Sequence, residues 1–208
     1  MGIILIKGYS KFYLQKVESL NKQGLVYSIN TGDKTIGKLQ ESKISSKKAG
    51  NRMIKLASLI LLAIPDRIIV ESLEIDLLDE EGKMVGYIKK EIGFYKDLTL
   101  YTKNGEHIAT VKSTSKGKLP SIKVIDVNGN ELLTAIGSYD AIDFTVSDSS
   151  TNELVTLIKK RSLFYETIKE NLFNNDVYHI ENSDYKEDVI FELIGIVVAI
   201  DIHFHMGQ

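Results

Sequence analysis

The sequence contains no cysteine among its 208 residues. Disulfide bonds, thiolate catalysis and metal centres held by cysteine are therefore excluded. It also lacks a surplus of positive charge, because 26 Lys and Arg stand against 28 Asp and Glu, for a formal net charge of −2. A dedicated nucleic-acid-binding protein carries a basic surplus. No nucleic-acid partner is therefore expected.

We expect neither a secretory signal peptide nor N-myristoylation at the start of this sequence. The apolar residues after Met1-Gly2 have no basic region before them, unlike a secretory signal peptide. Ile6 stands where a myristoylation motif needs Ser or Thr. The composition fits an ordinary globular protein of this length. We expect a single domain over residues 1–208 in the cytosol, with a peripheral membrane contact as an open alternative.

The longest apolar run, residues 188–201, lies near the end of the chain and is interrupted only by Glu192. As a helix it would be roughly 20 Å long, too short for a bilayer core of roughly 30 Å. A helix that is apolar all round must be buried on every side. Asp184 and Glu187 have the spacing of a capping box. We predict a core helix over about 185–201, and a pair of buried strands is the alternative because Val and Ile favour strands.

Most of the remaining sequence reads as strands joined by tight turns. Four units share the pattern strand, Asp/Asn/Gly turn, strand, and they cover 73–89, 98–112, 122–136 and 144–159. Asn-Gly at 104–105 and 128–129 is a strong hairpin signal. Strands are also expected near 3–7, 12–17, 26–29, 35–39, 164–172 and 177–181. A closed barrel would remove the free edges of such a sheet and needs a filled interior, so the predicted fold is a mostly β barrel wrapped around the C-terminal helix.

Two segments depart from this pattern. Gly32 to Lys38 matches the start of a phosphate-binding loop, but Leu39 stands where a hydroxyl should hold magnesium, so we interpret it as a hairpin. Residues 51–64 follow the basic pair Lys47-Lys48 and are largely apolar. We expect a helix or long strand packed on the body there. The alternative is a segment that dips into a membrane surface.

The end of the chain and parts of the repeats resemble the tubby-like superfamily, especially phospholipid scramblases and plant LURP-one-related proteins. The similar parts are Leu73-Glu74-Ile75, Gly86-Tyr87-Ile88-Lys89-Lys90, Asp143-Phe144-Thr145-Val146 and the chain from Val177 onward. The resemblance implies a twelve-stranded antiparallel barrel around a hydrophobic C-terminal helix. It also implies lipid binding, because tubby proteins bind phosphoinositides through basic surface residues.

The chain departs from the scramblases within this superfamily. Those proteins are associated with palmitoylated cysteines and with an Asp-rich calcium segment, whereas this chain has no cysteine and carries Asn174-Asn175-Asp176 at the corresponding place. A calcium site needs six to eight oxygen ligands with several carboxylates. An exposed turn is the simpler interpretation there, and scramblase activity is not carried over.

Basic residues are the candidate ligand-binding groups. Lys89-Lys90 and Lys159-Lys160-Arg161 end two of the repeat units, so in equivalent hairpins they would lie at similar places on the barrel. They could bind anionic lipid headgroups by charge. Alternatively, they only keep exposed strands soluble.

No catalytic constellation is visible in the sequence. His203 and His205 alternate but have no identifiable third metal ligand, so a polar tail is expected; Asp140 and Asp143 fit turn chemistry. We predict a non-enzymatic binding module without cofactor or metal, whose ligand is an anionic membrane lipid headgroup. The alternatives are a protein-interaction module and a lipid-modifying or hydrolytic enzyme with carboxylate or His groups at a barrel mouth.

Overall fold

A computed structural model describes residues 11–17, 25–42, 72–93, 96–114, 119–162, 176–181 and 189–205. The described residues form twelve strands and one α-helix that continues into a short π-helix. The strands are β1 (Lys11–Lys16), β2 (Val26–Thr31), β3 (Lys34–Glu41), β4 (Leu73–Asp79), β5 (Met84–Lys90), β6 (Leu98–Thr102), β7 (His107–Thr114), β8 (Ser121–Asp126), β9 (Glu131–Gly137), β10 (Asp143–Asp148), β11 (Leu154–Ser162) and β12 (Asp176–Glu181).

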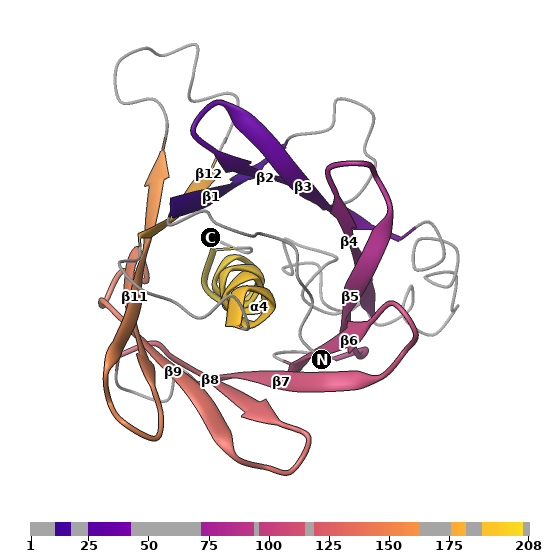
Figure 1. The fold of residues 1–208 in the computed structure, drawn as a ribbon. Coiled ribbons are helices and arrows are strands. Elements are labelled where there is room, and N and C mark those ends of the chain that lie inside the picture. Colours follow the sequence, from indigo (N-terminus) through magenta and orange to yellow (C-terminus); the bar gives the residue numbers. More distant parts are fainter. Residues whose placement is uncertain are drawn as a thin grey trace, which may run out of the picture.

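The strands form a closed antiparallel barrel in which each strand pairs with its neighbours in sequence (Figure 1). The barrel closes where β1 pairs with β12, with Phe12 opposite Ile180. Buried and solvent-facing residues alternate along β4, where Leu73, Ile75 and Leu77 point inward. The predicted mostly β, closed barrel is therefore confirmed, and its edges are used up in pairing.

The tight turns of the repeat units form as their sequences predict. Gly82, Gly105 and Gly129 adopt φ angles of +78°, +85° and +88°, which glycine enters at no steric cost. Gly32, at φ +52°, lies between β2 and β3. The suspected phosphate-binding loop is thus a hairpin, because no helix follows it to offer its N-terminus to phosphate groups.

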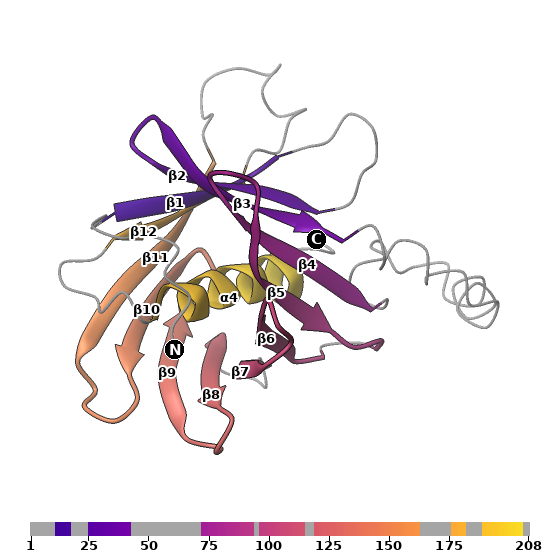
Figure 2. The same cartoon turned by 45° about the vertical axis from the view of Figure 1, so that its right-hand side comes forward.

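Helix α4 (Ile190–Ile200) passes through the barrel, and all eleven of its residues are buried (Figure 2). It packs most closely on β6, β7 and β8. Gly195 permits this approach, because a methyl group there would lie 3.0 Å from a Leu100 methyl carbon and 3.1 Å from a Val111 methyl carbon. No helix in the described parts of the chain is long and apolar enough to cross a membrane.

The helical structure runs further than the sequence predicts. After α4 the chain forms a π-helix, η3 (Asp201–His205), so His203 and His205 belong to a helix and the expectation of a polar tail is wrong. The predicted start near 185 and the capping box at Asp184 and Glu187 lie outside the described residues.

Several other predictions also fall outside the described residues. These are the apolar segment 51–64, the strands near 3–7 and 164–172, and the turn residues Asn174 and Asn175. Asp176 is described, and the expectation of an exposed turn is wrong at this position, because Asp176 is a buried residue of β12 that pairs with Lys160.

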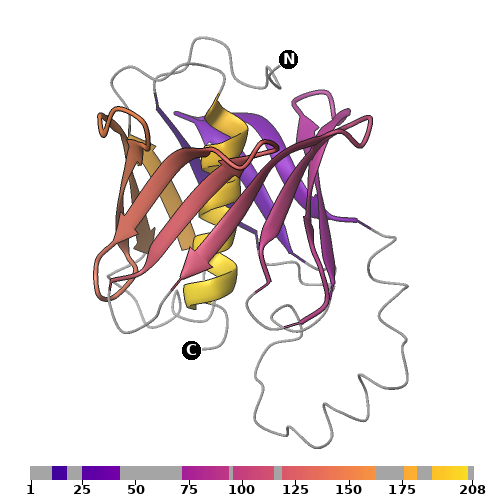
Figure 3. The same ribbon diagram turned by 90° about the horizontal axis from the view of Figure 1, so that it is seen from below.

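Odd-numbered strands run one way and even-numbered strands the other, so the turns that follow even-numbered strands all lie at one end of the barrel. We call the end that carries the turns after β2, β4, β6, β8 and β10 the hairpin end. The opposite end holds the C-terminus of α4, and we call it the Asp201 end (Figure 3).

Candidate functional site

The five predicted lipid-binding residues lie on two opposite walls of the barrel. Lys89 and Lys90 end β5, whereas Lys159, Lys160 and Arg161 lie in β11. In the closed ring β5 and β11 are six strands apart by either route, and Figure 1 shows them on opposite sides. The structure therefore does not bring the five residues into one patch.

Alternation along the strands further divides these residues between outside and inside. Three of them face outward, and each is paired with a carboxylate. The pairs are Lys89 with Glu91 at 2.8 Å, Lys159 with Glu181 at 3.0 Å and Arg161 with Asp143 at 2.9 Å. Because these charges are largely compensated, they would attract an anionic headgroup less than unpaired cations.

The other two predicted residues face the interior of the barrel. Lys90 is only 1% exposed, and its ammonium donates to the backbone carbonyl oxygens of Glu91 and Gly93 at 3.3 and 3.4 Å. Lys160 forms an ion pair with Asp176 at 3.0 Å and lies 5.9 Å from the ring centre of Tyr178. Both lysines thus take part in the polar lining of the Asp201 end.

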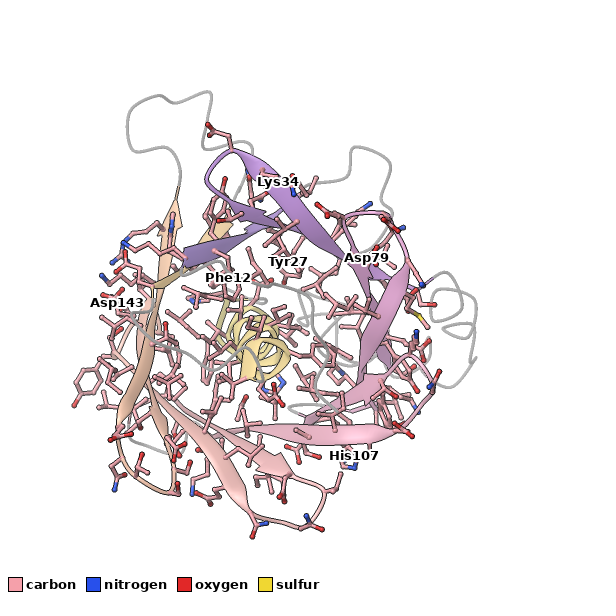
Figure 4. All side chains as sticks on the ribbon, in the orientation of Figure 1. Phe12, Tyr27, Lys34, Asp79, His107 and Asp143 are labelled. Carbon is pink, nitrogen blue, oxygen red and sulfur yellow. The ribbon has the colours of Figure 1, made fainter. Side chains whose placement is uncertain are left out.

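Asp201 is the centre of that lining and is 0% exposed. The hydroxyl groups of Tyr27 and Tyr178 donate to its two carboxylate oxygens, the latter at 2.7 Å. The Lys16 ammonium lies 3.1 Å from the Oδ2 atom. Figure 4 shows Tyr27 inside the ring of strands. The network joins the end of α4 to β1, β2 and β12.

The two tyrosine hydroxyl groups are held in the protonated form that donates hydrogen bonds. Burial, reinforced by the negative charge of Asp201, raises the pKa of both hydroxyl groups well above their usual value. Their protons therefore stay on the phenol oxygens. Asp201 thus accepts from two tyrosine hydroxyl groups and faces an ammonium, an arrangement that fixes the end of the helix to the barrel wall.

The two histidines of η3 pack against the same end of the barrel. The Nε2 atom of His205 lies 2.9 Å from the carbonyl oxygen of Ala141, a non-glycine residue with φ +55°. Burial lowers the pKa of both rings, to about 4 for His203, where the charge of Lys90 adds to the effect. Nowhere in the described residues do three His, Asp or Glu side chains converge as metal ligands.

The Asp201 end also exposes apolar side chains. Tyr139, in the turn between β9 and β10, is 91% exposed. Four more exposed apolar residues lie at or near this end: Val17, Ile92, Leu119 and Ile136. Met84, Val127 and Leu154 are exposed at the hairpin end. There they share the surface with the carboxylates of the turns, at Asp33, Asp79, Glu80, Glu81, Glu106, Asp126, Glu131, Asp148 and Glu153.

Sequence reasoning missed the Asp201 network. The available signal was Asp201 itself, a charged residue directly after an apolar run. The charge that stood out in the sequence was instead Glu192, which is buried in the first turn of α4. Tyr27 is separated from Asp201 by 174 positions, so no local pattern could connect them. Asp140 behaves as predicted, since it accepts from Ser138 and the Ile142 backbone within a turn, whereas Asp143 begins β10 and its carboxylate pairs with Arg161.

Comparisons with known proteins agree with the fold and leave function open. No family model matches this chain, and no curated protein matches it. Among solved structures, the chain is similar to the X-ray structure of a protein from Arabidopsis thaliana, with a TM-score of 0.51 and 14% sequence identity. The similarity covers 97% of this chain and 99% of that one. At this identity the likeness concerns the fold alone.

Proposed function

We propose that this chain is a non-enzymatic binding module that rests its Asp201 end on an anionic membrane surface. The observation that carries the proposal is that five of the eight large apolar side chains exposed among the described residues lie at or near this end. Tyr139, Ile92 and Leu119 lie in its connecting segments. Tyrosine suits the boundary between headgroups and hydrocarbon, because its ring is apolar and its hydroxyl is polar.

The interior of the barrel supports a function carried by the outer surface. Helix α4 fills the centre with buried side chains, among them Leu193, Ile196 and Val197. A barrel that is filled in this way is a packed core and not a ligand cavity. The resemblance to tubby-like proteins points in the same direction, since tubby proteins bind phosphoinositides at their surface.

Charge favours the same orientation. The acidic turns of the hairpin end would be repelled by anionic lipids, so this end would face away from them. At the Asp201 end Lys96 and Lys112 are exposed and form no ion pair with the described residues. We assign headgroup attraction to these two lysines ahead of Lys89, Lys159 and Arg161, whose charges are paired.

Vesicle flotation tests the proposal. The wild-type chain should float with phosphatidylcholine vesicles that contain a phosphoinositide, not with phosphatidylcholine alone, and binding should weaken as salt rises. Changing Lys96→Glu and Lys112→Glu together should lower the affinity at least roughly tenfold, since each basic residue near the surface contributes about 1 kcal/mol. Adding Tyr139→Ser to this double variant should lower the affinity for the vesicles further.

The matched control reverses the same number of charges at the other end, in Lys83→Glu with Lys103→Glu. Both residues are exposed turn residues of the hairpin end. This variant should bind like the wild type. An equal loss of vesicle affinity in both double variants would show that binding depends on the net charge of the protein and not on the position of the lysines. Absence of wild-type flotation even at low salt would refute membrane binding and favour a protein-interaction module.

A further inference from the structure

A row of side chains crosses the outer wall of the barrel from β4 to β7. Asp76 lies directly opposite Tyr87, Tyr87 opposite Tyr101, and Tyr101 opposite His107. Buried residues alternate with the row along β4, β5 and β6, and His107 at the start of β7 is exposed, so the row faces the outside of the barrel. Figure 4 shows His107 beside β7, away from the central helix. We call Asp76, Tyr87, Tyr101 and His107 the aromatic row.

The rings of the aromatic row stack on the sheet surface. The Tyr87 and Tyr101 centroids are 4.9 Å apart with an angle of 14° between their planes. The ring of His107 lies 5.7 Å from that of Tyr101 and is tilted by 41°. Aromatic faces carry partial negative charge and attract cations placed over them. The stack therefore offers a rigid surface with a preference for positive groups.

Negative charge borders the row at its β4 end. Glu74 and Asp76 project from the same face of β4, two residues apart. Burial, reinforced by the charge of Glu74, raises the pKa of Asp76. Within the described residues no cation is paired with Asp76. Lys89, directly opposite Glu74, has its ammonium 2.8 Å from Glu91, and this hydrogen bond, with a smaller contribution from the charge of Glu74, raises the pKa of Lys89.

We infer that the aromatic row docks a basic segment of a partner protein, with a lysine or arginine side chain held between the Asp76 carboxylate and the tyrosine rings. Residues opposite each other in antiparallel strands have Cβ atoms about 5 Å apart. A cation above Asp76 and Tyr87 therefore reaches the carboxylate and the ring face together. This is a second surface, on the wall of the barrel, and it does not depend on the membrane contact proposed for the Asp201 end.

The chemistry of the row selects this kind of partner. Nucleic acid and anionic lipid are disfavoured by Glu74 and Asp76, which carry the same sign of charge as phosphate. Addition of a peptide strand to the sheet is excluded for the described barrel, because every strand already pairs on both sides. Recognition must use side chains, and the side chains present suit cationic groups. The planar guanidinium of arginine also stacks on aromatic rings.

Fluorescence anisotropy at low salt tests the inference. The probe is a labelled nonapeptide of alternating Arg and Gly, and a peptide of alternating Glu and Gly is the negative control. The wild type should bind the Arg peptide and not the Glu peptide. Tyr87→Leu should lower the affinity about three- to fivefold, the value of an exposed cation–π contact. Asp76→Asn should do the same by removing one charge partner.

The controls make the same chemical changes away from the row. Tyr139→Leu removes a tyrosine that is 91% exposed and lies outside the row, and Glu81→Gln removes a carboxylate at the hairpin end. Both should bind the Arg peptide like the wild type. Asp76→Asn is isosteric, and Asp76 has no hydrogen bond to lose within the described residues, so this variant tests the site without disturbing the fold.

Three results would overturn the inference. The first is unchanged affinity in Asp76→Asn, and the second is an equal loss in Glu81→Gln. The third is absence of binding between the wild type and the Arg peptide at low salt.

Discussion

The hydrogen bond from Tyr178 to Asp201 gives the sharpest test of how the central helix is held. The Tyr178 hydroxyl group donates to the Oδ1 atom at 2.7 Å, and both side chains are buried. The change Tyr178→Phe removes this bond and keeps the ring that packs beside Lys160 and His205. Loss of a hydrogen bond to a charged group lowers the free energy of unfolding by about 1.5–3 kcal/mol. We expect a loss in this range.

Removing the acceptor should cost more than removing one donor. Asp201→Ala leaves two buried hydroxyl groups and the Lys16 ammonium without their common partner. Breaking a buried charge pair costs about 3–5 kcal/mol. The Lys16 side chain is 25% exposed and can turn toward water, so we expect the lower half of that range. Tyr27→Phe combined with Tyr178→Phe should deviate from additivity, because both donors bind one carboxylate.

Urea unfolding followed by far-ultraviolet circular dichroism measures these effects. The midpoint should shift without a change in slope, which would indicate that the surface exposed on unfolding is unchanged. Tyr139→Phe is the matched control, since Tyr139 is 91% exposed and should lie within about 0.5 kcal/mol of the wild type. If Tyr178→Phe unfolds at the wild-type midpoint, the network does not hold the helix and the argument is wrong.

Further predictions concern the core, pH and nucleotides. Ile196→Ala should lower the free energy of unfolding by about 2–5 kcal/mol in the same assay, because Ile196 is fully buried. Ile136→Ala on the outer wall should change it little, and equal effects of the two changes would contradict a core helix. Burial lowers the pKa of His203 from 6.5 to about 4, so the unfolded chain takes up this proton at a higher pH than the folded chain. The free energy of unfolding should therefore fall by about 2–3 kcal/mol as the pH drops from 6.5 to 4. His203→Gln should flatten that dependence in urea titrations at each pH. Calorimetry should show no magnesium-dependent ATP binding, and binding that is lost in Lys38→Ala would disprove the hairpin interpretation.

The barrel and its helix could be predicted because both follow from local patterns. Alternation such as Ile122 and Val124 around Lys123 places one face inward, and the structure buries those two residues while exposing the lysine. A segment apolar on every side, from Ile190 to Ile200, has to be surrounded. The resemblance to tubby-like proteins supplied the number of strands, which local patterns alone do not fix.

The polar end of the helix could not be predicted, because its partners are distant in sequence. In the sequence, Asp201 only marks the end of an apolar run. Closure of the barrel places Tyr27 and Tyr178 next to it, and local sequence patterns do not indicate this contact. The same limit applies to the basic run Lys159-Lys160-Arg161. Three consecutive basic residues suggest one patch. In a strand, however, successive side chains point to opposite faces, so Lys160 faces inward and the other two face outward.

The position of Asp201 bears on how the helix is oriented in the barrel. A carboxylate at the C-terminal end of a helix meets the negative end of the helix dipole and is disfavoured there. Lys16 and the two tyrosine hydroxyl groups offset this cost at the end where Asp201 lies. A helix inserted the other way round would place the same carboxylate among the acidic turns of the hairpin end, with no equivalent donors from these residues. We therefore expect the network to favour the observed direction of α4 in the barrel, together with the close packing of Gly195 on Leu100 and Val111.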